Sequence, residues 1–187
     1  MSYFLTLSSS PTKFSKAGFL LRSIGSVLQQ RAVEFRAIQA LDMPPIEPGT
    51  HRSANQFIAN TVEQVQQAAA IALVTPATKE SSPTLLASLL SLLPDDAFSR
   101  KPLLLFAIGG LPGQVAILER ALKQILFRLG TTTIAARVHV GTGSWILVGD
   151  DHPRLSRGVE SEVAYAIDLV LTAINPPEVS LEPAGFR

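Results

Sequence analysis

A short apolar run near the middle of the chain constrains the fold more than any other feature. Residues 69–74 read AAIALV, an unbroken apolar segment that ends in a β-branched valine. The run is too short for a helix of ordinary length, so it predicts a strand buried on both faces, as in the middle of a parallel sheet. Thr75-Pro76 follows at once, and the proline is expected to end the pairing because it has no N–H group to donate.

Helical patterns alternate with this strand and with four others. The further strands are predicted at residues 3–7, 32–38, 103–108 and 131–140. The helices are predicted around residues 19–28, at 55–67, 83–93 and 154–174, and between Pro112 and Gly130. This alternation indicates an α/β domain of three layers, with helices on both faces of a five-stranded parallel sheet. Placing the two most apolar strands centrally, with right-handed crossovers, favours the flavodoxin-like strand order 2-1-3-4-5.

Composition and charge exclude several classes of protein. The 187 residues are 47% apolar, and we expect a single domain over residues 1–174, followed by a proline-containing tail at 175–187. A formal net charge of +1 without a basic cluster argues against binding to nucleic acid. The absence of cysteine rules out disulfides and suits a reducing compartment. We see no signal peptide and no apolar stretch of the roughly 18 residues that span a membrane, so a cytoplasmic location is expected.

Three loops should meet at the carboxyl ends of strands 1, 3 and 4, where open α/β sheets bind ligands. Residues 8–15 hold four serines before a helix, a pattern that suits a phosphate and is equally typical of simple helix capping. Gly109-Gly110 would let a flat group approach the backbone, although alone it indicates a tight turn. Together with the polar loop at residues 77–81, these features favour a mononucleotide such as FMN.

Other catalytic and binding patterns are absent from the sequence. It contains neither GxxxxGKS nor GxxxxGKT for a nucleoside triphosphate, and no GxGxxG follows the first strand. The segment GTGSW at residues 141–145 is not the GxSxG turn of a hydrolase, and residues 141–153 should form a loop or a hairpin. The three histidines lack the spacing of metal ligands, and His139 is expected to be a packed strand residue.

The loop residues resemble those of the NADPH-dependent FMN reductase family, and especially the small flavin reductases that feed alkanesulfonate monooxygenases. The likeness extends over residues 4–140 and is carried by LSSSP at 7–11, PATK at 76–79, LLP at 92–94, KP at 101–102 and GG at 109–110. It implies a flavodoxin-like fold, hydride transfer from NADPH or NADH to FMN, and a flavin-dependent monooxygenase as partner. It also implies a homodimer or homotetramer.

The same resemblance implies a role for each matching loop residue. The FMN phosphate would be held by Ser10, Thr12 and Ser15, with Ser8 and Lys16 nearby. The isoalloxazine and ribityl chain would be lined by Pro76, Ala77, Thr78 and Lys79, with Gly109, Gly110 and Leu111 under the other edge. No catalytic side chain is expected, because the flavin carries the chemistry.

Two further observations bear on activity and assembly. Ser9 stands where the family usually has glycine, Thr78 where it usually has tyrosine, and residues 82–84 where it often has Tyr-Ser-Gly. These departures motivate an alternative, a non-catalytic flavodoxin-like subunit that binds FMN or regulates a partner.

In the helix at 83–93, which Ser82-Pro83 should begin, six leucines cover an arc of about 160°, wider than a core-facing stripe needs. The surplus predicts that subunits associate through this helix.

Overall fold

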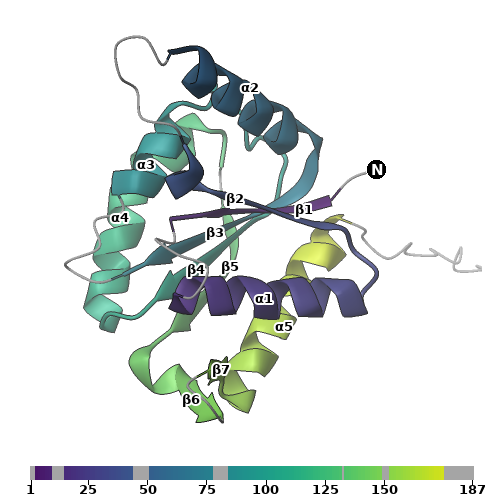
Figure 1. Cartoon of the computed structure of the whole chain (residues 1–187), viewed down its shortest axis with the longest axis vertical. Coiled ribbons are helices and arrows are strands. Elements are labelled where there is room, and N and C mark those ends of the chain that lie inside the picture. Colours follow the sequence, from purple (N-terminus) through teal and green to yellow (C-terminus); the bar gives the residue numbers. More distant parts are fainter. Residues whose placement is uncertain are drawn as a thin grey trace, which may run out of the picture.

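The computed structural model describes residues 3–9, 15–43, 51–77, 84–131, 133–148 and 152–174. At its centre is a five-stranded parallel sheet in the order β2-β1-β3-β4-β5 (Figure 1). The strands are β1 (Tyr3–Ser8), β2 (Phe35–Gln39), β3 (Ala68–Pro76), β4 (Leu103–Ile108) and β5 (Ile134–Val140). This is the flavodoxin-like order predicted from the sequence.

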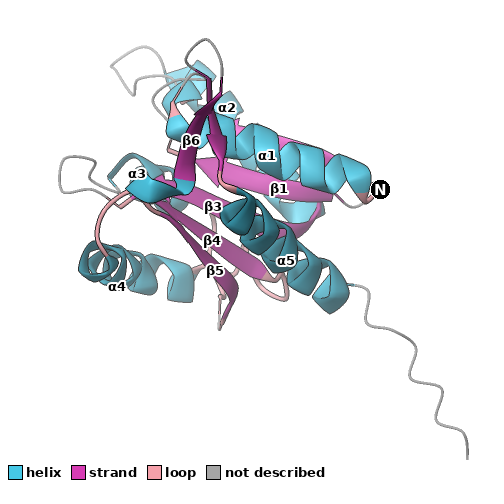
Figure 2. Cartoon of the chain, turned by 90° about the horizontal axis from the view of Figure 1, so that it is seen from below, coloured by secondary structure: helices cyan, strands magenta, loops and turns pink. Residues whose placement is uncertain are grey.

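Five α-helices cover the sheet. They are α1 (Lys16–Gln30), α2 (His51–Gln67), α3 (Thr84–Ser91), α4 (Pro112–Arg128) and α5 (Arg157–Ile174). Figures 1 and 2 show α1 and α5 on one face of the sheet, with α2, α3 and α4 on the other. The other regular elements among the described residues are two 3₁₀ turns, at Ala40–Asp42 and Thr142–Ser144, and an antiparallel hairpin of β6 (Trp145–Val148) and β7 (His152–Leu155). None of the described helices is long and apolar enough to cross a membrane.

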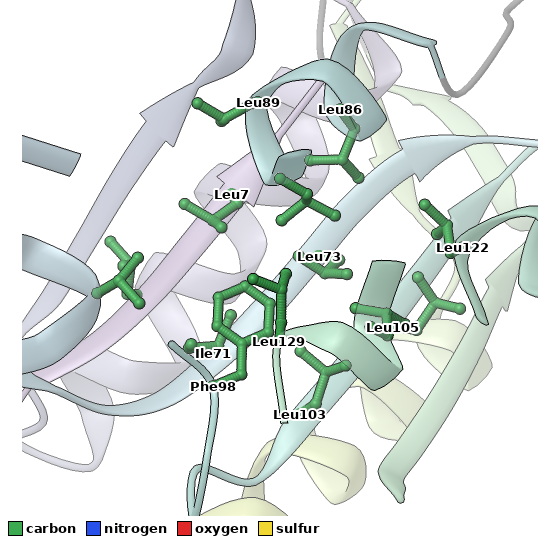
Figure 3. Packing of buried hydrophobic residues seen from close by; sticks show 14 of the residues in the cluster. Leu7, Ile71, Leu73, Leu86, Leu89, Phe98, Leu103, Leu105, Leu122 and Leu129 are labelled. Atoms are coloured by element: carbon green, nitrogen blue, oxygen red, sulfur yellow. The ribbon is translucent and has the colours of Figure 1, made fainter. Parts of the chain in front are cut away.

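The side chains of each central strand divide between two hydrophobic cores. In β1, Tyr3, Leu5 and Leu7 pack under α2, α3 and α4, whereas Phe4 packs under α1 and α5. This division follows from the two-residue period of a strand, which turns successive side chains to opposite faces. Figure 3 shows the first core, where Leu7 and the leucines of β3 and β4 meet residues of α3 and α4.

Pro76 is the last residue of β3, as expected from the sequence, but it is itself still paired within the sheet, contrary to the expectation that it would end the pairing. It pairs with Ile108 of β4, and the next residue, Ala77, still donates its N–H to the Ile108 carbonyl at 2.8 Å. Successive backbone groups of a strand point to opposite neighbours, so the position of the missing Pro76 N–H faces β1. Pairing with β1 has already ended one step earlier, at Ser8 and Val74. The proline therefore costs the sheet no hydrogen bond.

Several strands and helices begin at other residues than the sequence predicts. The strand expected from residue 32 begins at Phe35, because Ala32 has a φ of 54° and closes a turn instead. The strand expected from residue 131 begins at Ile134, and the helix expected from residue 55 begins at His51. The last helix begins at Arg157 and not at Arg154, because Leu155 ends the β6–β7 hairpin. The hairpin itself is one of the two predicted forms of this segment.

Most leucines of the third helix are buried in its own subunit. Leu86, Leu89, Leu90 and Leu93 have at most 2% of their surface exposed, and Leu85 packs partly against the same core. Leu93 lies past the end of α3, in the turn that follows. The predicted cap at Ser82-Pro83 lies outside the described residues. Much of the wide apolar arc is therefore explained by the core of a single chain.

An ion pair joins the end of α1 to α5. Arg31 Nε and Nη2 donate to the two carboxylate oxygens of Asp168, the latter at 2.7 Å. The pKa of Asp168 is lowered, chiefly by these hydrogen bonds and then by the positive charge. Their side chains are 28% and 48% exposed, so we expect the pair to contribute about 1 kcal/mol or less.

Asp168→Asn is expected to lower the free energy of unfolding by about 1 kcal/mol or less near neutral pH. The pKa of an aspartate in an unfolded chain is about 3.9. A carboxylate whose pKa is lower than this in the folded protein stabilises the fold at pH values above about 3.9, and the contribution is lost as the pH falls through the lowered folded pKa. The difference between parent and variant should therefore be constant from about pH 5 to 8 and shrink below about pH 4. Urea unfolding across this range measures it, and exposed Glu162→Gln on the same helix is the control.

Candidate functional site

The three loops singled out from the sequence begin side by side at one edge of the sheet. Ser8, the last residue of β1, pairs with Val74 of β3, and Pro76 at the end of β3 pairs with Ile108 of β4. The segments that leave these strands therefore start as neighbours, at the carboxyl edge where α/β sheets bind ligands. Ser10, Thr12, Thr78 and Lys79 lie outside the described residues.

The first loop leads into a regularly capped helix. Ser15 is the N-cap of α1, with extended backbone angles and a side-chain oxygen that accepts from the Gly18 N–H at 3.1 Å. The first backbone N–H groups of α1 therefore face the loop, and with the helix dipole they favour an anion there. Lys16 is exposed beside them, its ammonium 6.0 Å from the centre of the Trp145 ring. The arrangement suits a phosphate group.

Ser9 fits the loop by turning its side chain into the protein. Its hydroxyl lies 3.1 Å from that of Thr75 in β3, and its N–H donates to the Val74 carbonyl at 3.1 Å. Ser9 is buried and its φ is not positive. A glycine is therefore not required here, because neither the backbone angles nor the packing needs the absence of a side chain.

The end of β3 and the turn after β4 approach each other closely. Gly110 has a φ of 71°, and a Cβ atom placed on it would lie 2.2 Å from the Ala77 carbonyl oxygen. Gly109 also has a positive φ, of 69°. No side chain fits at Gly110 without moving the backbone, so the glycine is required by both conformation and space. The backbone of the turn after β4 therefore lies directly against that of Ala77.

The turn after β4 leaves one backbone donor unpaired among the described residues. The Gly109 N–H donates to the Val140 carbonyl at 2.8 Å, and the Leu111 N–H donates to Gln114 Oε1 at 2.7 Å. The Gly110 N–H between them has no partner within the described part of the chain. A free N–H in a turn of two half-buried glycines is suited to an acceptor atom on a flat ligand. The residues present therefore fit the ring of FMN.

Sequence reasoning missed three residues that shape this edge. His139 was expected only to be packed, yet its Nε2 lies 2.9 Å from the Gly109 carbonyl oxygen. Gln114 holds the Leu111 N–H, and Thr75 holds the Ser9 hydroxyl. The position of His139, one residue before the end of a strand at the carboxyl edge, is a signal that could have identified it.

Two grooves lie away from this edge. One, of about 630 Å³, separates α1 from the β6–β7 hairpin and is lined by Phe19, Arg22 and Trp145 among others. The second, of about 810 Å³, runs between α4 and β5 past Arg120, Lys123 and Phe127. The described residues contain no cluster of side chains able to hold a metal ion. The carboxyl edge therefore remains the candidate site, because the backbone donors and the capped helix lie there.

Comparison with solved structures agrees with the fold. An oxidoreductase from Corynebacterium diphtheriae has a TM-score of 0.68 at 16% identity, over 93% of this chain and 97% of that one. An apo NADH:FMN oxidoreductase has a TM-score of 0.73 at 24% identity, over 98% of this chain and 92% of that one. At these identities the likeness shows the flavodoxin-like fold alone.

Similarity in sequence is more specific. A Pseudomonas putida protein named FMN reductase (NADPH) is 31% identical over 125 residues, which are 67% of this chain. The match spans 64% of that curated relative, a little under two thirds of its length. The model of the NADPH-dependent FMN reductase family matches residues 3–144, most of the described fold. The chain therefore belongs to the NADPH-dependent FMN reductase family.

Proposed function

We propose that this chain is an NAD(P)H-dependent FMN reductase, which transfers a hydride from NADPH or NADH to FMN. Family membership supports the proposal, and the observation that carries it is the joining of two features at one sheet edge. The capped start of α1 offers an anion site, and the Gly110 N–H, which has no partner among the described residues, offers a donor in a turn of two glycines. A mononucleotide with a phosphate at one end and a flat ring at the other matches both.

The residues of the three loops divide the binding of FMN between them. The phosphate would be bound at the start of α1 by Ser8, Ser10, Thr12, Ser15 and Lys16, and the ring and ribityl chain by Pro76, Ala77, Thr78, Lys79, Gly109, Gly110 and Leu111. FMN, when bound, supplies the hydride acceptor. The protein's part is to bind and orient, and Gly110 contributes to it because its N–H can fix an acceptor atom of the ring.

The partner we propose is a flavin-dependent monooxygenase that uses the reduced FMN. The resemblance to the flavin reductases of alkanesulfonate monooxygenase systems supports this partner. Leu111 is 71% exposed beside the glycine turn, so the rim of the proposed site is open to a second molecule in the single chain. A cytoplasmic location is proposed with it, because a chain without cysteine suits a reducing compartment.

We also propose that the protein is a homodimer or homotetramer through the helix at residues 83–93. The half-buried Leu85 and Leu92 support this, together with two exposed apolar residues of the neighbouring α4, Ile117 at 69% and Phe127 at 79%. Exposed apolar residues on adjacent helices are typical of an interface. Light scattering at micromolar concentration should give a mass of two or four chains. A single species of 20.0 kDa would contradict the interface.

The test of the reductase is whether FMN makes the protein oxidise NADPH. Purified protein freed of flavin should oxidise NADPH only when FMN is added, with a rate that saturates as FMN is raised. NADPH deuterated at the transferred position should slow flavin reduction in stopped-flow mixing, because a C–H bond breaks in that step. FMN binding without any NADPH oxidation would instead favour the non-catalytic subunit, which the departures at Ser9 and Thr78 motivate. Failure to bind FMN at high micromolar concentration would overturn both.

A further inference from the structure

The turn after β4 is held in place from the last strand of the sheet. Gly109 donates its N–H to the Val140 carbonyl at 2.8 Å, and its own carbonyl lies 2.9 Å from His139 Nε2. Because a carbonyl oxygen only accepts, the His139 Nε2 must carry a hydrogen and donate it. Two neighbouring residues of β5 therefore fix both polar groups of Gly109.

The peptide between Gly109 and Gly110 needs such a restraint. Both residues have positive φ, of 69° and 71°, and glycine adopts many other backbone angles at little cost. In a trans peptide the carbonyl of one residue and the N–H of the next point in opposite directions. While His139 holds the Gly109 carbonyl, the unpaired Gly110 N–H is directed away from His139.

Reversal of this peptide would change what the turn offers to a ligand. It would direct the Gly109 carbonyl oxygen to the side now occupied by the Gly110 N–H. An acceptor would then face the acceptor atoms of a ligand, with repulsion in place of a hydrogen bond. The neighbouring Leu111 N–H cannot replace the lost donor, because it is already bonded to Gln114.

We infer that His139 is a positioning residue for the flavin site, which holds the Gly109–Gly110 peptide with its N–H available to the ring of FMN. The inference rests on the proposed function. His139 acts through the turn and is given no contact with the flavin. Its side chain and that of Arg137 lie on the same face of β5, where Arg137 pairs with Glu119 of α4 at 3.1 Å. Arg137 therefore supplies a matched position away from the turn.

The experiment compares His139→Leu, His139→Gln and Arg137→Ala with the parent. FMN dissociation constants are measured through the fluorescence of Trp145, the sole tryptophan. His139→Leu should weaken FMN binding about three- to tenfold, the effect of one hydrogen bond, and His139→Gln should restore it because its amide can donate at similar reach. Arg137→Ala should leave the constant within about twofold of the parent.

A second measurement needs no flavin. The carbonyl ¹³C shift of Gly109 and the amide ¹⁵N shift of Gly110 should change in His139→Leu and return toward the parent in His139→Gln. Urea unfolding establishes that each variant is folded. Parent-like affinity and unchanged shifts in the folded His139→Leu protein would overturn the inference while leaving the proposed function intact. If the parent itself fails to bind FMN, the proposed function is wrong and the role given to His139 falls with it.

Discussion

Gly110→Ala is expected to abolish measurable FMN binding at micromolar concentration and, with it, any FMN-dependent oxidation of NADPH. The new Cβ would lie 2.2 Å from the Ala77 carbonyl oxygen, so one of the two loops must move. The φ of 71° adds about 1–2 kcal/mol of strain for any residue with a side chain. Both effects act on the two backbone segments proposed to hold the ring, so affinity should fall by more than a hundredfold.

Gly113→Ala is the matched control for this substitution. Gly113 lies in the first turn of α4, where a Cβ would meet nothing within 4 Å. Alanine is the better helix former by about 1 kcal/mol, so the variant should be as stable as the parent or slightly more so and should bind FMN normally. Equilibrium dialysis gives the affinity, and urea unfolding should place Gly110→Ala about 2 kcal/mol below the parent. Normal FMN binding by Gly110→Ala would place the flavin away from this turn.

The fold was predictable because its determinants are local patterns. The apolar segment at residues 103–108 is β4 without any change of boundary, and the segment at 69–74 is the middle of β3. The pairing of the residue at the end of β3 was predicted wrongly. Pro76 ends β3 as expected but is still paired with β4, and whether a proline can pair there is decided by where the other neighbour, β1, stops, which a single segment of sequence does not reveal.

The candidate site was predictable in outline and not in its supporting contacts. Sequence patterns placed the serine loop and Gly109-Gly110 at one edge, because strand order alone determines which loops are neighbours. The hydrogen bond from His139 joins residues 30 positions apart, and that between Ser9 and Thr75 joins residues 66 apart. Such pairs arise from strand register and side-chain direction, so the spacing of residues along the chain does not reveal them.

Ser15→Asp separates helix capping from binding of the phosphate. Aspartate caps a helix as well as serine does, and its charge is favourable at a helix N-terminus, so α1 should keep its stability. The same charge would face the phosphate proposed to bind there. At a separation of about 5 Å and an effective dielectric constant of about 20, two unit charges repel by about 3 kcal/mol. FMN binding should therefore weaken by a hundredfold or more.

Ser15→Asn is the control, because asparagine has nearly the shape of aspartate, caps equally well and carries no charge. It should unfold at the same urea concentration as the parent and bind FMN within a few fold of it. The loss of FMN affinity in Ser15→Asp should diminish as the salt concentration is raised, because ions screen the repulsion. Riboflavin, which lacks the phosphate, should bind parent and Ser15→Asp alike. If riboflavin and FMN binding were weakened equally, the aspartate would distort the loop. If the affinity for FMN were unchanged, the phosphate would not bind at the start of α1.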